Sequence, residues 1–457
     1  MIEKLREKSQ TVLLKPSIRV LYLRKLRDSV KNHREEIISA LKEDIGKSEY
    51  EGFMTEYATV MQELDFFINN TLKLARTKNA SFDLLTFPNK TEIRNRAFGV
   101  CFIISPWNYP FNLSMIPVID AIAAGNSVYL MMSRKNPRIR ELMKEVLKPV
   151  EDIVHLENDR SYDEVLEEKF DFYFFTGSKN RGQAVYKKAA EYLKPCVLEL
   201  GGKSPCIVDK DVDLEDVAKK ICWAKFTNSG QTCVAVDYLV VEESIKDRLL
   251  HYILKEIDEN YSDISEMSRI KTRAKYDEFR KIMRDRTDRI GGKYHDDEMI
   301  IEPCVFTDVT FNDEIMKDEI FGPLLPVISY TDIDAMLMHI RRMDNPLAFY
   351  VFTKDKKLCD YITNSVGFGG GCINDCMMHI SNNKAPFGGF GNSGLGHYHG
   401  KWGFDTFSHK QSVYVSRKID NPFRFKPFTS KKLDLMKKFL GSLERIILDT
   451  LVKSTEL

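Results

Sequence analysis

The chain has 457 residues, a length that predicts two or three domains of roughly 100–200 residues each. It is 43% hydrophobic and 30% charged with a formal net charge of +1, so its overall charge gives no reason to expect nucleic acid as a partner. The nine cysteines have no repeated pair spacing, which argues against a metal site or a disulfide framework and favours reduced thiols in the cytoplasm.

Two features of the sequence argue against export and membrane insertion. The first ten residues, MIEKLREKSQ, are charged where a signal peptide needs an apolar run. The longest apolar stretch, MIPVIDAIAAGNSVYLMM, is interrupted by Asp120, Gly125 and Asn126, which makes it a poor transmembrane span. We therefore expect a soluble, cytoplasmic protein.

The first 76 residues have the pattern of amphipathic helices. Apolar residues recur among charges at helical spacing, at Leu23, Leu26, Val30, Ile37 and Leu41. Gly46 is expected to end this helical region, and a second periodic stretch covers about 52–76. A link containing proline and asparagine then leads to Val100–Ile104, a short apolar run that predicts a buried strand.

From residue 100 the chain alternates between short apolar runs and helical segments. Further strands are predicted at Val128–Met131, Phe172–Phe175, Cys196–Leu198 and Pro205–Val208. Helices are predicted between them, near 110–124, 137–149 and 182–193. This alternation predicts a parallel sheet covered by helices on both faces. Beyond residue 209 the order repeats more loosely, through Tyr238–Val241 and helices near 244–257 and 268–286.

The tail after about residue 409 differs from the rest of the chain. From His409 to Leu440 it carries nine Lys and Arg residues against two Asp. It ends in an amphipathic stretch that contains Leu433, Met436, Phe439, Leu440 and Leu443. The favoured interpretation is a terminal helix docked on the body or on a partner subunit, and the alternative is weak contact of a basic helix with an anionic membrane.

Five stretches look unlike generic structure: SPWNYPFN (105–112), LELGGKSPC (198–206), FTNSGQTC (226–233), EIFGPLLP (319–326) and PFGGFGNSG (386–394). At this order and spacing they resemble the aldehyde dehydrogenase superfamily. The class three branch of this superfamily acts on fatty, medium-chain and aromatic aldehydes. This chain is similar to that branch in its shortened N-terminus and in the sequences GKSPC, FTNSGQTCVA and PFGGFGNSGLGHYHGK. The likeness runs from about residue 15 to 440.

The resemblance implies an α/β fold with a Rossmann-type parallel-sheet cofactor domain, an α/β catalytic domain and a small β bridging arm. The expected division assigns 1–80 and 98–199 to the cofactor domain, 200–405 to the catalytic domain, 81–97 and 406–425 to the bridging and oligomerisation arm, and 426–457 to a C-terminal helical tail. Members of this branch are typically dimers joined through such arms, so we expect a homodimer.

The resemblance also implies three catalytic residues. Cys233 matches the family's nucleophile, and a thiolate adds readily to an aldehyde carbon. Asn108 matches the oxyanion donor, a kind of interaction that contributes about 3–4 kcal/mol. Glu199 matches the general base that activates water to hydrolyse the thioester left by hydride transfer. Taken singly, these residues could instead be a core cysteine, a turn asparagine and a solvated glutamate.

Other motif residues match the family's contacts with NAD or NADP. Glu319 matches the carboxylate that holds the nicotinamide ribose, and Phe321 the ring beside the nicotinamide. Gly177, Ser178 and Gly182 match the turn and helix start where the pyrophosphate approaches backbone N–H groups. Three more residues match the strand end next to the cofactor: Ser105, Pro106 and Trp107.

The chain departs from the family where the adenosine ribose is usually bound. The family's Lys-Pro-Ser-Glu is replaced by Met131-Met132-Ser133-Arg134. A carboxylate would repel a 2′-phosphate, whereas Arg134 can bind one in bidentate fashion, so we expect a preference for NADP or a weak grip on either nucleotide. The family's GSTGVG becomes GSKNRG, and its usual Gly-Gly pair near 156–159 becomes Leu-Glu-Asn-Asp.

The leading prediction is oxidation of an aldehyde to a carboxylic acid with a nicotinamide cofactor, and two alternatives stay open beside it. An acylating relative would pass the thioester to another acceptor, for which a water-activating Glu199 would be a liability. The other alternative is a non-catalytic or cofactor-impaired homologue with a binding or structural role. The absence of the family's usual contacts with the adenosine ribose favours it, and the presence of Asn108, Glu199 and Cys233 opposes it.

Overall fold

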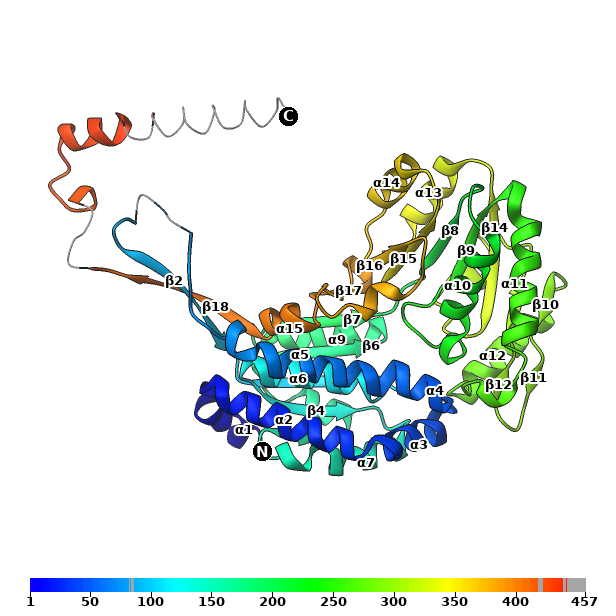
Figure 1. Cartoon of the computed structure of the whole chain (residues 1–457), viewed down its shortest axis with the longest axis horizontal. Coiled ribbons are helices and arrows are strands. Elements are labelled where there is room, and N and C mark those ends of the chain that lie inside the picture. The colour runs from blue at the N-terminus through cyan, green and yellow to red at the C-terminus, as the bar shows by residue number, and fades with distance from the viewer. Residues whose placement is uncertain (82, 84–85, 418–421, 439–440, 442–457) are drawn as a thin grey trace. The chain divides into compact units, whose positions relative to one another are not determined.

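A computed structural model describes residues 1–81, 83, 86–417, 422–438 and 441 (Figure 1). These residues form two compact units. The first consists of Met1–Ala75 and Arg96–His409, and the second of Arg76–Asn95 and the chain from Lys410 onward. Both large sheets belong to the first unit, so the expected cofactor and catalytic halves lie within one compact body.

The first large sheet has six strands in the order β17-β7-β6-β3-β4-β5, and only β17 runs antiparallel to its neighbour. The strands are β3 (Val100–Ser105), β4 (Ser127–Met132), β5 (Val154–Leu156), β6 (Phe172–Gly177), β7 (Cys196–Leu200) and β17 (Gly394–Leu395). The strand order reverses between β3 and β6, and the carboxyl ends of strands at such a switch point are where doubly wound sheets bind ligands.

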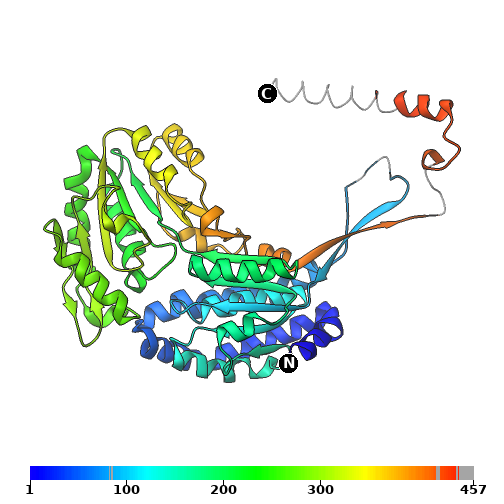
Figure 2. The same ribbon diagram turned by 180° about the vertical axis from the view of Figure 1, so that it is seen from behind.

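Helices cover both faces of this sheet, as the two opposite views show (Figures 1 and 2). Along β3, Cys101 and Ile103 pack on one side with α2, α3 and α5–α7, and Val100 and Phe102 pack on the other with α1, α8 and α9. The helices are α1 (Ile2–Gln10), α2 (Pro16–Asn32), α3 (Arg34–Ile45), α5 (Ala58–Leu74), α6 (Asn112–Ala124), α7 (Pro137–Leu147), α8 (Tyr162–Leu166) and α9 (Lys179–Glu191).

The N-terminal helical region is divided where the sequence predicted one continuous run. The chain leaves helical geometry at His33, whose backbone N–H and ring Nδ1 both contact the carbonyl oxygen of Ser29. Gly46 ends α3 in a left-handed conformation with φ 84°, which confirms the predicted stop. A short helix, α4 (Glu49–Gly52), and a π-helical turn, η2 (Phe53–Tyr57), then lead into α5. Such π turns often occur at functional sites.

The second large sheet has seven strands in the order β10-β13-β14-β9-β8-β15-β16, and only β10 is antiparallel to its neighbour. The strands are β8 (Pro205–Val208), β9 (Tyr238–Glu242), β10 (Arg289–Gly291), β13 (Cys304–Phe306), β14 (Leu324–Tyr330), β15 (Ala348–Phe352) and β16 (Gly370–Ile373). The alternation of strands and helices therefore did predict parallel sheets, and the α/β class is confirmed.

Helices also cover both faces of the second sheet. One face packs against α10 (Leu214–Phe226) and α11 (Lys246–Asn260). The other packs against α12 (Arg273–Arg284), α13 (Ile333–Arg342) and α14 (Lys356–Ser365). The remaining regular elements of this unit are the hairpin β11 (Tyr294–His295) and β12 (Ile300–Ile301), and the helix α15 (Gly400–Thr406).

The second unit contains a three-stranded sheet in the order β1-β2-β18. Its strands are β1 (Lys78–Asn79), β2 (Lys90–Ala97) and β18 (Ser408–Val415). Residues 430–438 are helical, and Phe439, Leu440 and Leu443 of the predicted amphipathic stretch lie outside the described residues. Among the described residues, no helix combines the length and the apolar character that crossing a membrane requires.

Candidate active site

A cavity of about 260 Å³ is lined in part by residues at the carboxyl ends of β3, β6 and β7. It brings together most of the residues that the sequence motifs singled out: Pro106, Trp107, Asn108, Gly177, Ser178, Glu199, Cys233, Glu319 and Phe321. Ser105, Gly182 and Arg134 do not line it. The motifs from both large sheets therefore meet in one place, next to the topological switch point of the first sheet.

A second cavity, of about 280 Å³, shares part of its wall with the first. The shared residues are Leu113, Cys233, Phe387 and Tyr398. The rest of its lining is rich in apolar side chains, among them Met54, Ile116, Trp223, Val234, Met377, Met378 and Ile380. Cys233 is thus reached from two cavities, one lined by the predicted cofactor contacts and one mainly by apolar groups.

Cys233 follows a backbone segment with unusual geometry. Asn228 and Ser229 adopt left-handed conformations with φ of 53° and 50°, which cost energy for residues other than glycine. The Asn228 side chain offsets this cost, because its Nδ2 donates to the backbone oxygen of Asn108 at 3.0 Å and to that of Gln231 at 3.2 Å. Strained segments of this kind cluster at functional sites, where the surrounding contacts keep them in place.

The Cys233 side chain is a protonated thiol at neutral pH. Burial raises its pKa to about 12, and the neighbouring carboxyl groups of Glu319 and Glu199 add to the rise. The thiolate is the nucleophilic form of a cysteine, so a thiol with this pKa has to lose its proton before it can attack a carbon atom.

Glu199 presents an unusual carboxyl group to the same cavity. It lies in β7, is only 3% exposed, and neither of its oxygens has a hydrogen-bond partner among the described residues. Burial raises its pKa well above the ordinary glutamate value. A carboxyl group that titrates closer to neutrality suits proton transfer, because a base is most effective when its pKa lies near the working pH.

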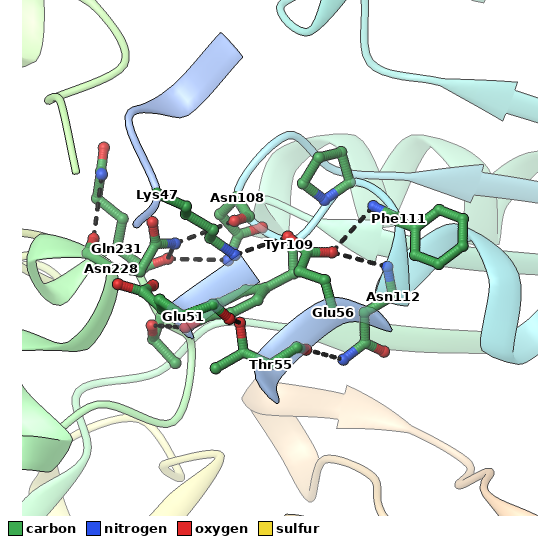
Figure 3. Close-up of polar contacts among 12 residues, drawn as sticks. Lys47, Glu51, Thr55, Glu56, Asn108, Tyr109, Phe111, Asn112, Asn228 and Gln231 are labelled. Atoms are coloured by element: carbon green, nitrogen blue, oxygen red, sulfur yellow. Dashed lines mark hydrogen bonds and ion pairs between the residues drawn. The ribbon is translucent and has the colours of Figure 1, made fainter. Parts of the chain in front are cut away.

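Asn108 is held so that its side-chain amide lines the cavity. It is 4% exposed, and its Nδ2 donates one hydrogen bond to the backbone oxygen of Gln231 at 3.0 Å (Figure 3). An amide nitrogen carries two hydrogens, so a second one is available for an oxygen atom in the cavity. The bond to Gln231 fixes the plane of the amide close to the segment that carries Cys233.

Glu319, Phe321 and Trp107 form the wall expected to face a nicotinamide ribose. Gly201 lies so close to Glu319 that a Cβ atom there would be 2.1 Å from Oε2, and only glycine leaves room for this carboxyl group. Burial, with a contribution from the charge of Asp237, raises the pKa of Glu319 to about 8. The rings of Trp107 and Phe321 meet edge to face, with centroids 5.7 Å apart at 79°.

A buried lysine holds the segment that leads to Glu319. Lys203 Nζ lies 2.7 Å from Asp237 Oδ2 and donates to the backbone oxygens of Ile315 at 2.9 Å and Asp318 at 2.8 Å. Asp237 Oδ1 in turn accepts the N–H of Ile320 at 3.0 Å. Lys203 stands in the quoted GKSPC stretch, but its structural role could not be inferred from the sequence.

The residues between β6 and the first turn of α9 have two roles: the first of them line the cavity, and a later glycine packs α9 against β7. Gly177 and Ser178 line the cavity at the start of α9, and Ser178 makes no side-chain cap there, which leaves a helix N-terminus suited to an anion. The N–H of Gly182 donates to the backbone oxygen of Ser178 at 3.0 Å, and the contact of Gly182 with a pyrophosphate stays a prediction. A Cβ atom at Gly182 would lie 2.6 Å from Leu200, so this glycine allows α9 to pack closely on β7.

Ser105 and Arg134 also lie outside the cavity. The Ser105 hydroxyl is buried and bonds that of Ser114 at 2.6 Å, which fixes the strand end rather than a ligand. Arg134 is exposed just after β4, and its Nη2 donates to the backbone oxygens of Asp159 at 3.1 Å and Arg160 at 2.8 Å. The guanidinium therefore joins the segments that follow β4 and β5.

Motif reasoning missed two aromatic residues that line both cavities. Phe387 and Tyr398 pair through their backbones, with N–O distances of 3.1 and 2.8 Å, and their rings meet edge to face at 5.7 Å. Both stand in or beside stretches that the sequence singled out, PFGGFGNSG and GHYHGK. The sequence therefore singled out the stretches that contain these residues, but it did not indicate that their two rings line the site.

The comparisons with known proteins agree with this geometry. The aldehyde dehydrogenase family model matches residues 6–413. The 4,4'-diaponeurosporen-aldehyde dehydrogenase of Staphylococcus aureus is 37% identical over 426 residues, which cover 91% of this chain and 93% of the relative. Aldehyde dehydrogenase family 3 comG of Dictyostelium discoideum is 37% identical over 432 residues, which cover 92% of each chain.

A solved structure of the substrate-bound state of Staphylococcus aureus AldH is similar to this chain with a TM-score of 0.91 at 34% identity, and the match covers 96% of this chain and 99% of that one. The model match and the relatives together span most of the chain and include family 3 members. The chain belongs to the aldehyde dehydrogenase family and is an NAD(P)-dependent enzyme that oxidises aldehydes to carboxylic acids.

Proposed function

We propose that Cys233 is the nucleophile, Asn108 the oxyanion donor and Glu199 the hydrolytic base of this aldehyde oxidation. The observation that carries the proposal is the position of Cys233, which lines both cavities, one of which also contains the Asn108 amide and the unpartnered carboxyl group of Glu199. An aldehyde that enters through the apolar cavity presents its carbonyl carbon to the sulfur. No other nucleophilic side chain is needed for the chemistry that follows.

The proposed reaction has three steps. Cys233 loses its thiol proton to water and its sulfur bonds the carbonyl carbon, so the carbonyl oxygen becomes an oxyanion that accepts from Asn108 and from the N–H of Cys233. Return of the oxyanion to a carbonyl then expels a hydride from this carbon, which bound NAD or NADP would accept, and the adduct becomes a thioester. Glu199 next takes a proton from a water molecule that attacks the thioester carbon, and the thiolate leaves with the carboxylic acid as product.

The residues of the first cavity fit a nicotinamide dinucleotide. Glu319 and the space over Gly201 would hold the ribose hydroxyls of the nicotinamide end, with Trp107 and Phe321 beside the ring. The start of α9 at Ser178 would take the pyrophosphate. Bound NAD or NADP supplies the hydride acceptor. In this assignment 1–80 and 98–199 form the cofactor domain, which also contributes Asn108 and Glu199, and 200–405 form the catalytic domain that holds Cys233.

Glu199 favours hydrolysis over the acylating alternative. An enzyme that hands its thioester to a thiol or another acceptor has to exclude water, and a buried carboxyl group beside the sulfur promotes attack by water instead. The non-catalytic alternative is opposed by the presence of all three reacting groups at one cavity.

Assembly and location are further parts of the proposal. We infer a homodimer joined through the arm formed by 81–97 and 406–425, which is supported by a three-stranded sheet with β18 at its edge. Light scattering on the purified chain measures the oligomeric state. We also infer a cytoplasmic enzyme whose basic tail makes at most weak membrane contact, and co-sedimentation with anionic vesicles measures that contact.

Replacing Glu199 with glutamine should trap the thioester. Glutamine has nearly the same shape but cannot take a proton from water, so the first turnover proceeds and hydrolysis slows by about 10²–10⁴-fold. We expect a burst of about one NAD(P)H per active site at 340 nm, with the acyl group visible on Cys233 by mass spectrometry.

Two variants control this experiment. Cys233→Ala should abolish both burst and adduct, whereas Cys196→Ala, which removes another partly exposed thiol, should leave turnover unchanged. Undiminished steady-state turnover in Glu199→Gln would refute the role of Glu199 as base. A variant with neither burst nor turnover would move Glu199 to an earlier step.

Hydrolysis of the acyl-enzyme should accelerate as pH rises. Burial raises the pKa of Glu199, and only its ionised form accepts a proton, so the rate should climb through a midpoint well above the ordinary glutamate value of about 4.3. Cys233 is acylated at this stage, so its own ionisation does not contribute. Rapid pH jumps on acyl-enzyme prepared in one turnover measure this rate, and a flat profile from about pH 5 to about pH 9 would contradict the assignment.

Arg134 should favour NADP over NAD. If its guanidinium binds the 2′-phosphate, Arg134→Ala should weaken NADP binding by about 10- to 100-fold and leave NAD binding nearly unchanged. Calorimetric titration of the purified wild-type and variant chains with both nucleotides measures the difference. Clearly tighter binding of NAD by the wild-type chain would reject the preference.

The apolar cavity should make the enzyme prefer medium-chain, long-chain or aromatic aldehydes. Each buried methylene contributes about 0.8 kcal/mol, so kcat/KM should rise about fourfold per added carbon until the chain fills the cavity. A series of straight-chain aldehydes with increasing numbers of carbons, followed at 340 nm, measures this slope. Equal kcat/KM for the shortest and longest members would contradict an apolar substrate site.

A further inference from the structure

A buried ion pair lies next to the segment that follows Asn108, and the steps proposed above do not use it. Lys47, between α3 and α4, places its Nζ 2.6 Å from Oε1 of Glu56, which belongs to the π-helical turn η2. Both side chains are 0% exposed. Removing two charges from water is costly, and an apolar pair of similar volume is often at least as stabilising. Stability alone therefore does not explain why lysine and glutamate occupy these positions.

Glu56 binds the backbone that follows the oxyanion donor. Its Oε2 accepts the N–H of Phe111 at 3.0 Å and the N–H of Asn112 at 2.8 Å (Figure 3). The same turn of helix holds Asn112 a second time, because the backbone oxygen of Thr55 accepts its Nδ2 at 2.8 Å. Burial raises the pKa of Glu56, while Lys47 and the two N–H groups oppose that rise. Since every partner is a donor, the carboxylate form fits this site.

Lys47 contacts the residue directly after the oxyanion donor. Its Nζ lies 3.6 Å from the centroid of the Tyr109 ring, a short cation–π contact between two buried side chains. The Tyr109 hydroxyl is 2.6 Å from that of Thr232, the residue before Cys233. One ammonium group thus joins Glu56 to a ring that is bonded to the nucleophile segment.

The contacts of Asn108 itself show why its neighbours matter. Its Nδ2 donates to Gln231, and its backbone oxygen accepts from Asn228, but both partners belong to the strained segment before Cys233. The residues after Asn108 connect it to the helical layer. Glu56 accepts from Phe111 and Asn112, and at the start of α6 the N–H of Leu113 donates to the backbone oxygen of Tyr109 at 3.0 Å. The ion pair is therefore one of the contacts that set the position of the amide relative to the helical layer.

We propose that Lys47 and Glu56 are positioning residues that hold the Asn108 amide at the distance and angle required by the oxyanion formed on Cys233. This inference rests on the proposed role of Asn108. A charged pair serves this task better than an apolar one, because Glu56 fixes two N–H groups of one segment while Lys47 fixes the ring of the same segment. A displacement of about 1 Å at a reacting centre can cost about 10²-fold in rate.

A double-mutant cycle with Asn108 tests the proposal. Lys47→Met with Glu56→Gln removes both charges, keeps the side-chain volumes similar and leaves an oxygen to accept the two N–H groups. In the otherwise wild-type chain it should lower kcat by about 10- to 100-fold, with KM for the aldehyde changed by less than about threefold. In the Asn108→Ala background it should cause no further loss beyond about twofold, because there is no amide left to misplace.

Further variants keep the test decisive. Arg27→Met with Asp65→Asn removes another ion pair of the same helical layer, 2.5 Å between Nε and Oδ1 on α2 and α5, and should leave kcat unchanged. If the Lys47 and Glu56 substitutions unfold the chain, as circular dichroism would show, Tyr109→Phe replaces them. It removes only the hydroxyl that bonds Thr232, and its loss of kcat should likewise vanish without Asn108.

Three outcomes would overturn the inference. A wild-type kcat in the folded Lys47→Met, Glu56→Gln variant would show that the ion pair does not position the site. An equal loss in the presence and absence of Asn108 would show that it acts through another group. Full activity of Asn108→Ala alone would remove the oxyanion role itself, and that result is read from the single variant before the cycle is completed.

Discussion

The proposed chemistry depends on a carboxyl group that is buried and has no hydrogen-bond partner among the described residues. Glu199 is buried in β7 between β6 and β17, and its register partner in β17 is Gly394, which offers no side chain to bond or cover it. A side chain at Gly394 would collide with the backbone oxygen of Leu198. The stability of the sheet therefore offsets the cost of burying a carboxyl group without a hydrogen-bond partner. Burial also raises the pKa values of Glu199 and Cys233.

The proposed reacting groups come from segments next to both large sheets, and a small set of polar contacts joins them. Glu199 lies in β7 of the first sheet and Asn108 follows β3, whereas Cys233 follows α10, which packs on the second sheet. The junction consists of the bonds of Asn108 to Gln231 and Asn228, and of Tyr109 to Thr232. All three connect the segment after β3 to the few residues before Cys233. A shift of either segment would therefore move the Asn108 amide relative to the Cys233 sulfur.

The sequence was most informative where burial or a joint motif left little choice. Continuous apolar runs such as Val100–Ile104 predicted parallel strands because both faces of such strands are covered. The break at His33 was not predicted, since it depends on a local bond to Ser29 rather than on apolar spacing. Lys47 and Glu56 gave no signal, because two charged residues nine positions apart look like solvated surface until the fold buries them together. The packing of Gly182 on Leu200 could not be predicted for a similar reason, because it is visible only in three dimensions.

The segments that depart from the family's usual adenosine-binding residues are joined by a set of polar contacts. Glu157 stands where the family usually has glycine, and its Oε1 accepts the N–H groups of Asp159 at 2.8 Å and Arg160 at 3.0 Å. Burial works against its ionised form, yet these bonds and one from the Tyr129 hydroxyl hold the pKa of Glu157 at about 2. Arg134 then binds the carbonyl oxygens of the same two residues. The segment after β5 is thus held by a buried carboxylate on one side and by an arginine on the other, in place of the glycine pair that the family usually has. These contacts agree with the proposal above that Arg134 changes how the nucleotide is bound.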